Sequence, residues 1–154
     1  MAIGISRLDI SELSEAKELI KKVFMIFEAP DYSEAGTAHF LTYLEEELEQ
    51  EFASGQMQIW CGKCEDTIAG VLAVRLPAHV ALLFVDEAYH RQGIAKKMYQ
   101  TMISELLPEQ VTVNSSPYAV SAYQKMGFRL DGEEATVSGI RFQPMIFIRE
   151  DVRK

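Results

Sequence analysis

The segment from residue 85 to residue 97 has the residue types and spacing of an anion-binding turn. An apolar run ends at Val85, a short polar stretch follows, and a helix is predicted to begin around Gly93. The small residues Gly93 and Ala95 would let an anionic group approach the main chain closely. The N–H groups of a first helical turn lack partners within the helix, and the helix dipole adds positive potential there. The segment therefore favours a phosphate group as its ligand, and three basic residues lie within it: Arg91, Lys96 and Lys97.

Two common nucleotide-binding motifs are absent from the sequence. It contains neither the GxxxxGK[ST] loop of nucleoside triphosphate sites nor the GxGxxG loop of dinucleotide sites. A Gly-x-Ala turn after a strand can also be purely structural. The segment by itself leaves a structural role and a binding role open.

Tyr123 is a candidate for proton transfer. It lies on a helix that is predicted to start at Ser116-Pro117, a cap residue followed by proline, and to stop at Gly127. A phenol held beside a leaving group can donate a proton as the bond breaks. The spacing of Tyr123 also fits an inward core residue of an amphipathic helix, so both roles stay open.

The two cysteines form a CxxC pair, Cys61 and Cys64, for which we expect no chemical role. The pair is predicted to lie where a strand enters a turn, away from the helix N-terminus that would activate a thiolate. The sequence has no second CxxC and no HxxxH, so a four-ligand zinc site cannot be assembled locally. We expect no bound metal.

Length and charge narrow the class of protein. A chain of 154 residues fits one domain, residues 1–154, with a sizeable core. The formal net charge of -8 argues against a nucleic-acid partner, because neutralising phosphates requires clustered Lys and Arg. The longest uncharged apolar run, 80–85, is too short to cross a bilayer, and the N-terminus does not resemble a signal peptide. We expect a cytoplasmic protein with no membrane partner.

Local signals predict the elements of the N-terminal half. A strand at 3–8 precedes a helix that begins with a capping box at Asp9 and Glu12 and ends at Pro30. Ser33 caps a second helix, which closes at Gly55. Strands follow at 57–61, 67–76 and 80–85, and the short turns between them favour an antiparallel meander.

The C-terminal half alternates between helices and strands. A third helix follows Gly93, then a strand at 111–113, the helix that carries Tyr123, and a last strand at 141–149. Pro144 lies within the last strand and predicts an edge position or a bulge there. The order βααβββαβαβ predicts an α/β sandwich with a mixed sheet, in which the two strands flanking the third helix run parallel.

Two short motifs resemble those of the GNAT superfamily of N-acyltransferases. Residues 90–95, His-Arg-Gln-Gly-Ile-Ala, are similar to motif A of that family, Q/R-x-x-G-x-G/A, which lies at the same strand-to-helix junction. Residues 123–128, Tyr-Gln-Lys-Met-Gly-Phe, resemble its Y-x-x-x-G-F ending of the fourth helix. The predicted order of elements also matches, so the resemblance covers nearly the whole chain. His90 departs from the pattern, because it stands where the family usually has Gln or Arg.

The resemblance implies a three-layer α/β/α sandwich with a mixed, mostly antiparallel sheet and a splay between the central parallel strands, 80–85 and 111–114. It also implies that acetyl-CoA is the acyl donor. Its pantetheine arm would pair with main-chain groups near Phe84 and Val85, and Tyr123 would protonate the departing thiolate. Ser116 stands where many members have an Asn that contacts the coenzyme. The cofactor-binding turn would consist of His90, Arg91, Gln92, Gly93, Ile94, Ala95 and Lys96, with the pyrophosphate on the amides of residues 91–96.

The same resemblance places the acceptor beside the first two helices and their connection. Glu28 and Asp31 could hold an ammonium group or relay its proton, and Phe27 and Tyr32 could line an apolar pocket. An ordinary capped turn explains these residues equally well. Asp86, at the end of the central strand, is another candidate base that could instead anchor the following turn.

The function expected from the sequence is acetyl transfer from acetyl-CoA to a primary amine, by direct attack in a ternary complex. The alternative is a catalytically degenerate module of the same fold that senses acyl-CoA. The acceptor could be a small molecule or a peptide. Residues 139–145, near the C-terminus, could also form a homodimer contact.

Overall fold

The capping box predicted from the sequence starts the first helix. In the computed structural model, which describes residues 3–149, the Asp9 carboxylate accepts a hydrogen bond from the Ser11 N–H. The Glu12 carboxylate in turn accepts one from the Asp9 N–H. These caps follow β1 (Ile3–Arg7) and start the 3-10 turn η1 (Ile10–Glu12), which leads into α1 (Leu13–Phe27). The inner face of α1 is apolar and buried, with Leu13, Ala16, Ile20, Val23 and Phe24 on it.

The region predicted as one second helix is divided in two. After the 3-10 turn η2 (Ala29–Asp31), Ser33 caps α2 (Glu34–Glu46) as expected, its hydroxyl accepting a hydrogen bond from the Gly36 N–H at 2.9 Å. At Glu47, the residue between the two helices, φ widens to -116°, and α3 (Leu48–Ser54) begins after it. Gly55 ends α3 with a φ of 84°, which glycine adopts without strain.

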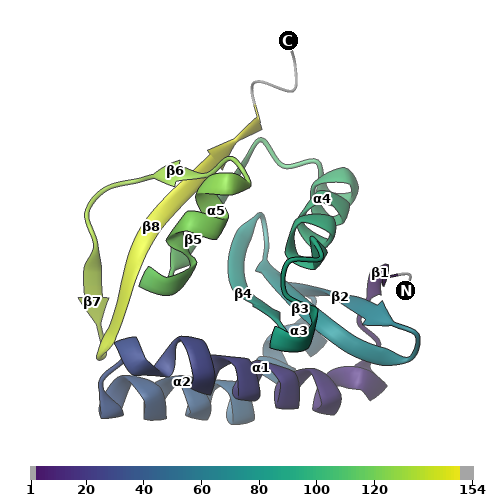
Figure 1. Cartoon of the computed structure of the whole chain (residues 1–154), viewed down its shortest axis with the longest axis horizontal. Helices are drawn as coiled ribbons and strands as arrows, with labels where there is room; N and C mark the ends of the chain where they lie inside the picture. The colour runs from purple at the N-terminus through teal and green to yellow at the C-terminus, as the bar shows by residue number, and fades with distance from the viewer. Residues whose placement is uncertain (1–2, 150–154) are drawn as a thin grey trace.

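One mixed sheet runs through the molecule (Figure 1), in the order β1-β2-β3-β4-β5-β8-β6, with β7 also paired to β8. The predicted antiparallel meander consists of β2 (Met57–Cys64), β3 (Thr67–Arg75) and β4 (His79–Val85). The chain then continues through η3 (Glu87–Tyr89), α4 (Ile94–Leu106), β5 (Gln110–Ser115), η4 (Pro117–Ala119) and α5 (Val120–Lys125). It closes with two short strands that the sequence did not predict, β6 (Arg129–Leu130) and β7 (Ala135–Val137), and with β8 (Ile140–Ile148).

The parallel strands β4 and β5 splay apart, as the resemblance implies. They pair at only two positions within residues 3–149, where the first residues of β4 meet the middle of β5: His79 with Thr112 and Val80 with Val113. Beyond Val80, β4 is paired on one side only, with β3. In Figure 1 the two strands diverge from this point, with α4 beside one and α5 beside the other.

The prediction that Pro144 marks an edge position or a bulge holds only locally: β8 lies inside the sheet, but among residues 3–149 no strand pairs with it at Pro144 on the side away from β5. β8 runs through Pro144 without a break in register, with Asn114 of β5 opposite. The Pro144 carbonyl accepts a hydrogen bond from the Asp131 N–H at 2.9 Å, on the side away from β5. Because the N–H and C=O of one strand residue face the same neighbour, the proline nitrogen also faces that side. There β6 has ended and β7 has not begun, so no ladder hydrogen bond is lost.

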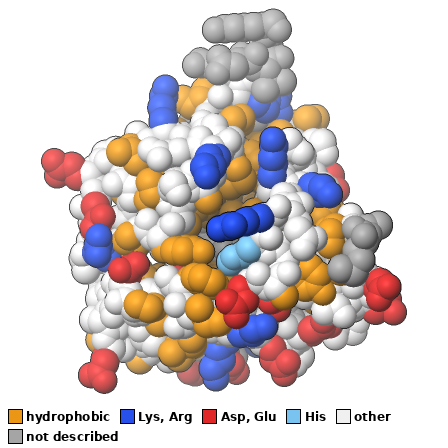
Figure 2. Space-filling view, viewed as in Figure 1, with side chains coloured by type: hydrophobic (Ala, Val, Ile, Leu, Met, Phe, Trp, Pro, Cys, Tyr) orange, Lys and Arg blue, Asp and Glu red, His pale blue; other side chains and the backbone are white. Residues whose placement is uncertain are grey.

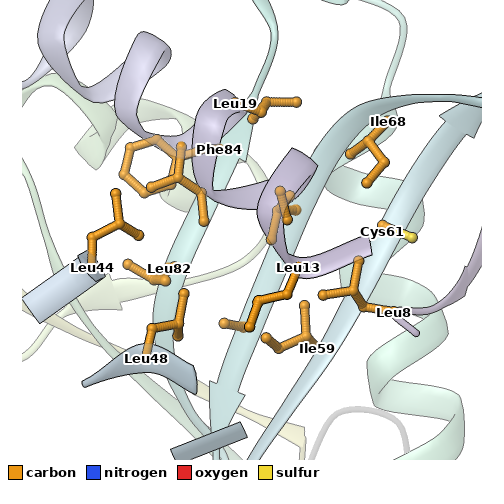
Figure 3. Packing of buried hydrophobic residues seen from close by; sticks show 14 of the residues in the cluster. Leu8, Leu13, Leu19, Leu44, Leu48, Ile59, Cys61, Ile68, Leu82 and Phe84 are labelled. Atoms are coloured by element: carbon orange, nitrogen blue, oxygen red, sulfur yellow. The ribbon is translucent and has the colours of Figure 1, made fainter. Parts of the chain in front are cut away.

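Each face of the sheet has its own hydrophobic core, which confirms the predicted α/β/α layers. Consecutive strand residues point to opposite faces, so β2 contributes Ile59 and Cys61 to one core and Trp60 to the other. Figure 3 shows the first core, where Leu44 and Leu48 of α2 and α3 lie near Leu82 and Phe84 of β4. The second core lies beneath α4 and α5. No helix within residues 3–149 is long and apolar enough to cross a membrane.

Candidate active site

A pocket of about 770 Å³ opens where β4 and β5 separate. Its walls come from the end of α1, the second half of β4, the turn before α4, the first turn of α4, and η4 with α5. Most of the predicted site residues line it: Phe27, Glu28, Phe84, Val85, His90, Arg91, Gly93, Ile94, Ala95, Lys96 and Tyr123. Five of them do not: Asp31, Tyr32, Asp86, Gln92 and Ser116.

The turn at 91–96 presents main-chain N–H groups at one end of this pocket. Arg91 and Gly93 both have positive φ, 67° and 74°, and Gly93 caps α4 with no side-chain hydrogen bond. The first helical hydrogen bond runs from the Lys97 N–H to the Gly93 carbonyl at 2.9 Å, so the N–H groups of residues 94–96 have no partner within α4. With Arg91 and Lys96 beside them, these groups can bind a phosphate.

The edge of β4 that faces the pocket carries main-chain groups that pair with no neighbouring strand within residues 3–149. The Asp86 N–H donates to the Ala69 carbonyl at 2.8 Å, so the pair before it, Val85 and Gly70, exchanges no hydrogen bonds. The N–H and C=O of Val85 therefore point away from β3, and those of Leu83 do the same. An extended ligand lying along this edge could pair with β4 as a strand would.

Tyr123 is buried on α5 and faces the pocket. Its ring packs edge-on against Phe128, with ring centroids 5.3 Å apart, and its exposed fraction is 5%. Burial raises the pKa of Tyr123 above its ordinary value, and the nearby charge of Glu28 raises it further. The hydroxyl is therefore protonated at neutral pH and can act as a proton donor.

Glu28 follows the last residue of α1 and lines the same pocket. Burial raises the pKa of its carboxyl group to about 7, the charge of Asp31 adds to that effect, and hydrogen bonding with the Ser116 side chain opposes it. A carboxyl group with a pKa near 7 is well matched to accepting a proton at neutral pH. The negative charge of Glu28 contributes to raising the pKa of both Tyr32 and Tyr123.

The surface around the pocket is basic in an otherwise acidic protein. Figure 2 shows Lys and Arg side chains gathered around the hollow at the centre of this face, with hydrophobic side chains beside them. Three basic residues line the pocket, Arg91, Lys96 and Lys125, whereas the chain as a whole has a net charge of -8. No cluster of His, Cys, Asp and Glu suited to a metal ion occurs within residues 3–149.

A comparison with family profiles identifies the family of this chain. The profile described as the acetyltransferase (GNAT) domain matches residues 28–148, most of the chain. The chain belongs to the GNAT acetyltransferase family. No curated protein matches this GNAT domain by sequence.

Solved structures share the fold over nearly the whole length. A GCN5-related N-acetyltransferase from Rhodopseudomonas palustris superposes with a TM-score of 0.82 at 14% identity, over 96% of each chain. The PaiA N-acetyltransferase from Thermoplasma acidophilum, solved with coenzyme A, gives 0.76 at 18% identity, over 96% of this chain and 99% of its own. The ribosomal-protein-S18-alanine N-acetyltransferase from Escherichia coli gives 0.63 at 17%, over 96% and 94%. At these identities the likeness shows the fold alone.

Asp86 lies outside the pocket of this GNAT domain and is held by other contacts. One carboxylate oxygen accepts a hydrogen bond from the Ala88 N–H at 3.0 Å, and the other contacts the Lys22 ammonium at 3.1 Å. Partial burial on its own would raise the pKa of Asp86, but these two partners outweigh it and leave the pKa below its ordinary value. Asp86 therefore anchors the following turn, and its lowered pKa makes it a weak base.

Three other predicted residues surround the pocket without lining it. The Tyr32 ring packs edge-on against Phe24 of the first core, at 5.0 Å between centroids. Asp31 is exposed and acts on the site through its charge on Glu28. The Ser116 hydroxyl caps η4 by accepting a hydrogen bond from the Ala119 N–H at 3.3 Å, as one of the two roles considered for it requires.

Two of the pocket residues that the sequence reasoning missed are Leu83 and Tyr118. Leu83 could have been found, because strand alternation gives it the same orientation as Val85. Tyr118 carried no such signal. It is half exposed and stacks on Phe27, with ring centroids 5.0 Å apart, so that η4 meets the end of α1 at the pocket.

Proposed function

We propose that this GNAT domain transfers an acetyl group from acetyl-CoA to a primary amine by direct attack in a ternary complex. The observation that carries the proposal is that one pocket joins the phosphate-binding turn, the unpaired edge of β4, Tyr123 and Glu28. The donor's diphosphate fits the N–H groups of residues 94–96, and its pantetheine amides fit the main-chain groups of Leu83 and Val85 that point away from β3. The acceptor is a small molecule or a peptide that carries the amine.

The proton transfers follow from the two environments. Glu28, as a carboxylate, takes a proton from the acceptor's ammonium group and leaves a neutral amine. The amine nitrogen attacks the thioester carbonyl carbon, and the C–S bond breaks as the amide forms. Tyr123 donates its proton to the departing sulfur, and the proton that leaves the nitrogen restores the phenol. The products are the acetamide and CoA with a free thiol.

The test compares Tyr123→Phe with the unaltered protein. Loss of the hydroxyl should lower kcat by about 10²- to 10⁴-fold, the usual range for a general acid, and leave CoA binding intact. Turnover is measured as release of free thiol over a panel of primary amines, and CoA binding by calorimetry. Tyr99→Phe is the matched control, because Tyr99 is a buried tyrosine that does not line the pocket. Unchanged turnover in Tyr123→Phe would remove Tyr123 from the mechanism.

The same measurements separate transfer from sensing. CoA binding by the unaltered protein with no thiol release for any amine would favour the acyl-CoA-sensing module. A ligand that binds only the folded state raises its melting temperature, so CoA should raise it and ATP or NAD should not. Stabilisation by ATP or NAD and not by CoA would contradict the proposal.

A further inference from the structure

His90 occupies the main-chain carbonyl that a pantetheine arm would use. Its Nε2 lies 2.9 Å from the Val85 oxygen, a distance at which the ring N–H donates a hydrogen bond. That oxygen belongs to the edge of β4 that faces the pocket, beyond the last residue paired with β5. The ring thus takes the place that the next strand would have in a continuous sheet.

Two further contacts hold the ring in this position. The His90 N–H donates to the Glu87 carbonyl at 3.2 Å, which closes η3 and fixes the backbone just before the phosphate-binding turn. The Phe27 ring packs against the imidazole, with ring centroids 5.3 Å apart. Phe27 in turn stacks on Tyr118. The three aromatic rings come from α1, the turn after β4, and η4, and all three line the pocket.

We infer that His90 competes with the pantetheine arm for Val85 and so sets the affinity and selectivity of this domain for its acyl donor. The inference rests on the proposed function, because it requires that the donor lie along β4. Binding of the arm then exchanges the hydrogen bond from His90 for one from a pantetheine amide. The ring must rotate away from Val85, which weakens its packing against Phe27. A ligand that contacts only the turn at 91–96 does not compete with His90 for Val85, so His90 should not affect its affinity.

The experiment compares a ligand that has the arm with one that lacks it. CoA carries both the diphosphate and the pantetheine, whereas adenosine diphosphate carries the diphosphate alone. Dissociation constants for both are measured by calorimetry on the unaltered protein and on His90→Ala, His90→Phe and His39→Ala. His90→Phe keeps a ring against Phe27 but has no N–H to donate. His39 is exposed on α2 and does not line the pocket, so it controls for the loss of a histidine.

Removing the competing hydrogen bond should strengthen CoA binding by about two- to tenfold, the range that one net hydrogen bond supports. We expect this gain in both His90 variants, no change in His39→Ala, and no change in adenosine diphosphate binding in any of them. Equal or weaker CoA binding in the His90 variants would overturn the competition. Stronger CoA binding in His90→Ala but not in His90→Phe would assign the effect to the volume of the ring. An equal gain in affinity for CoA and for adenosine diphosphate would assign it to the turn at 91–96. Either result would also overturn the competition. If none of the four proteins binds CoA, the proposed function itself fails, and the competition fails with it.

Discussion

Burial has a different chemical consequence for each of two residues that share the pocket. It raises the pKa of Glu28 to about 7, so that the carboxyl group is half ionised near neutral pH and can accept a proton. It also raises the pKa of Tyr123, which was already high, so that the phenol keeps its proton. One physical cause thus gives a base and an acid at the same site, because the two groups start from opposite sides of neutrality.

Asp31 allows the role of Glu28 to be tested without altering Glu28. Its negative charge raises the pKa of Glu28, so Asp31→Asn should lower that pKa and shift the acid limb of the kcat/KM profile to lower pH. The measurement is the pH dependence of thiol release with one fixed amine. Glu46→Gln removes the same charge from an exposed position on α2 and should leave the limb in place. An unshifted limb in Asp31→Asn would mean that Glu28 is not the group that titrates.

Tyr99 is a buried tyrosine whose hydroxyl has no hydrogen-bond partner among residues 3–149. Its ring packs against Phe128 and Phe147, and these contacts remain in Tyr99→Phe. Because an unsatisfied buried hydroxyl is costly, the substitution should leave the free energy of unfolding unchanged or raise it by about 1 kcal/mol.

Tyr43 provides the matched comparison for Tyr99. Its hydroxyl donates to Glu51 at 2.6 Å and lies 3.4 Å from an Arg75 nitrogen, so Tyr43→Phe should lower the free energy of unfolding by about 1–3 kcal/mol. Urea denaturation measures both variants. A larger loss of stability in Tyr99→Phe than in Tyr43→Phe would show that the Tyr99 hydroxyl is satisfied.

One contact at the scale of the elements joins the C-terminal strands to the start of α2. The turn between β7 and β8 lies against the N-terminus of α2, where the Ser33 N–H donates to the Gly139 carbonyl at 3.2 Å. A Cβ atom on Gly36 would overlap that same carbonyl oxygen. This contact ties the C-terminal strands to the connection between α1 and α2, which begins with Glu28.

Gly36→Ala should therefore lower the free energy of unfolding by about 1–3 kcal/mol, the usual cost of overpacking. The clash is with backbone atoms, which cannot rotate away as a side chain would. Denaturant unfolding measures the loss. Gly4→Ala is the control, because a Cβ there meets nothing within 4 Å, and it should be close to neutral. Equal stability of the two variants would show that the β7–β8 turn moves readily away from α2.

At the scale of the whole molecule, the pocket exists because two neighbouring strands of the sheet, β4 and β5, do not pair along their whole length. β4 and β5 pair at two positions and then separate, and the helices that follow each strand keep them apart by packing in the second core. The main-chain groups of β4 that no strand pairs with are available to a ligand. The half-buried Glu28 shows a conflict between stability and function, because an ionised carboxylate there is poorly solvated.

Glu28→Gln should be more stable than the unaltered protein at high pH. The pKa of Glu28 is about 7 in the folded state, whereas its ordinary value, which applies in the unfolded chain, is 4.5. Folding therefore favours the protonated form. The stability contribution of Glu28 is fully present below about pH 4.5 and is lost as the pH rises through about 7. Glutamine does not titrate, so between pH 5.5 and pH 8 the variant should gain about 1–3 kcal/mol on the unaltered protein.

Urea denaturation at the two pH values measures this gain, and thiol release should show that the same variant has lost activity. Glu46→Gln, which is exposed, should show no such dependence on pH. A constant difference in stability between Glu28→Gln and the unaltered protein at both pH values would place the carboxylate in water.

The sequence by itself determined the order of the main elements and the position of the turn at residues 91–96. Both depend on signals within a few residues of one another: the capping box at Asp9, the cap at Ser33, the Gly-x-Ala turn at Gly93 and the stop at Gly127. The two missed strands have only two and three residues, too few to show a periodicity. The sequence also did not predict the break between α2 and α3 at Glu47, because no glycine or proline lies there.

Only the tertiary structure decided which groups meet at the pocket. It brought Glu28 from α1 near Tyr123 from α5, placed the ring of His90 on the carbonyl of Val85, and engaged Asp86 with Lys22. Burial and charge at a point depend on residues from many parts of the chain, and no local pattern records them. The sequence could name two candidate bases, Glu28 and Asp86. The different environments of the two carboxylates give the physical reason to favour Glu28.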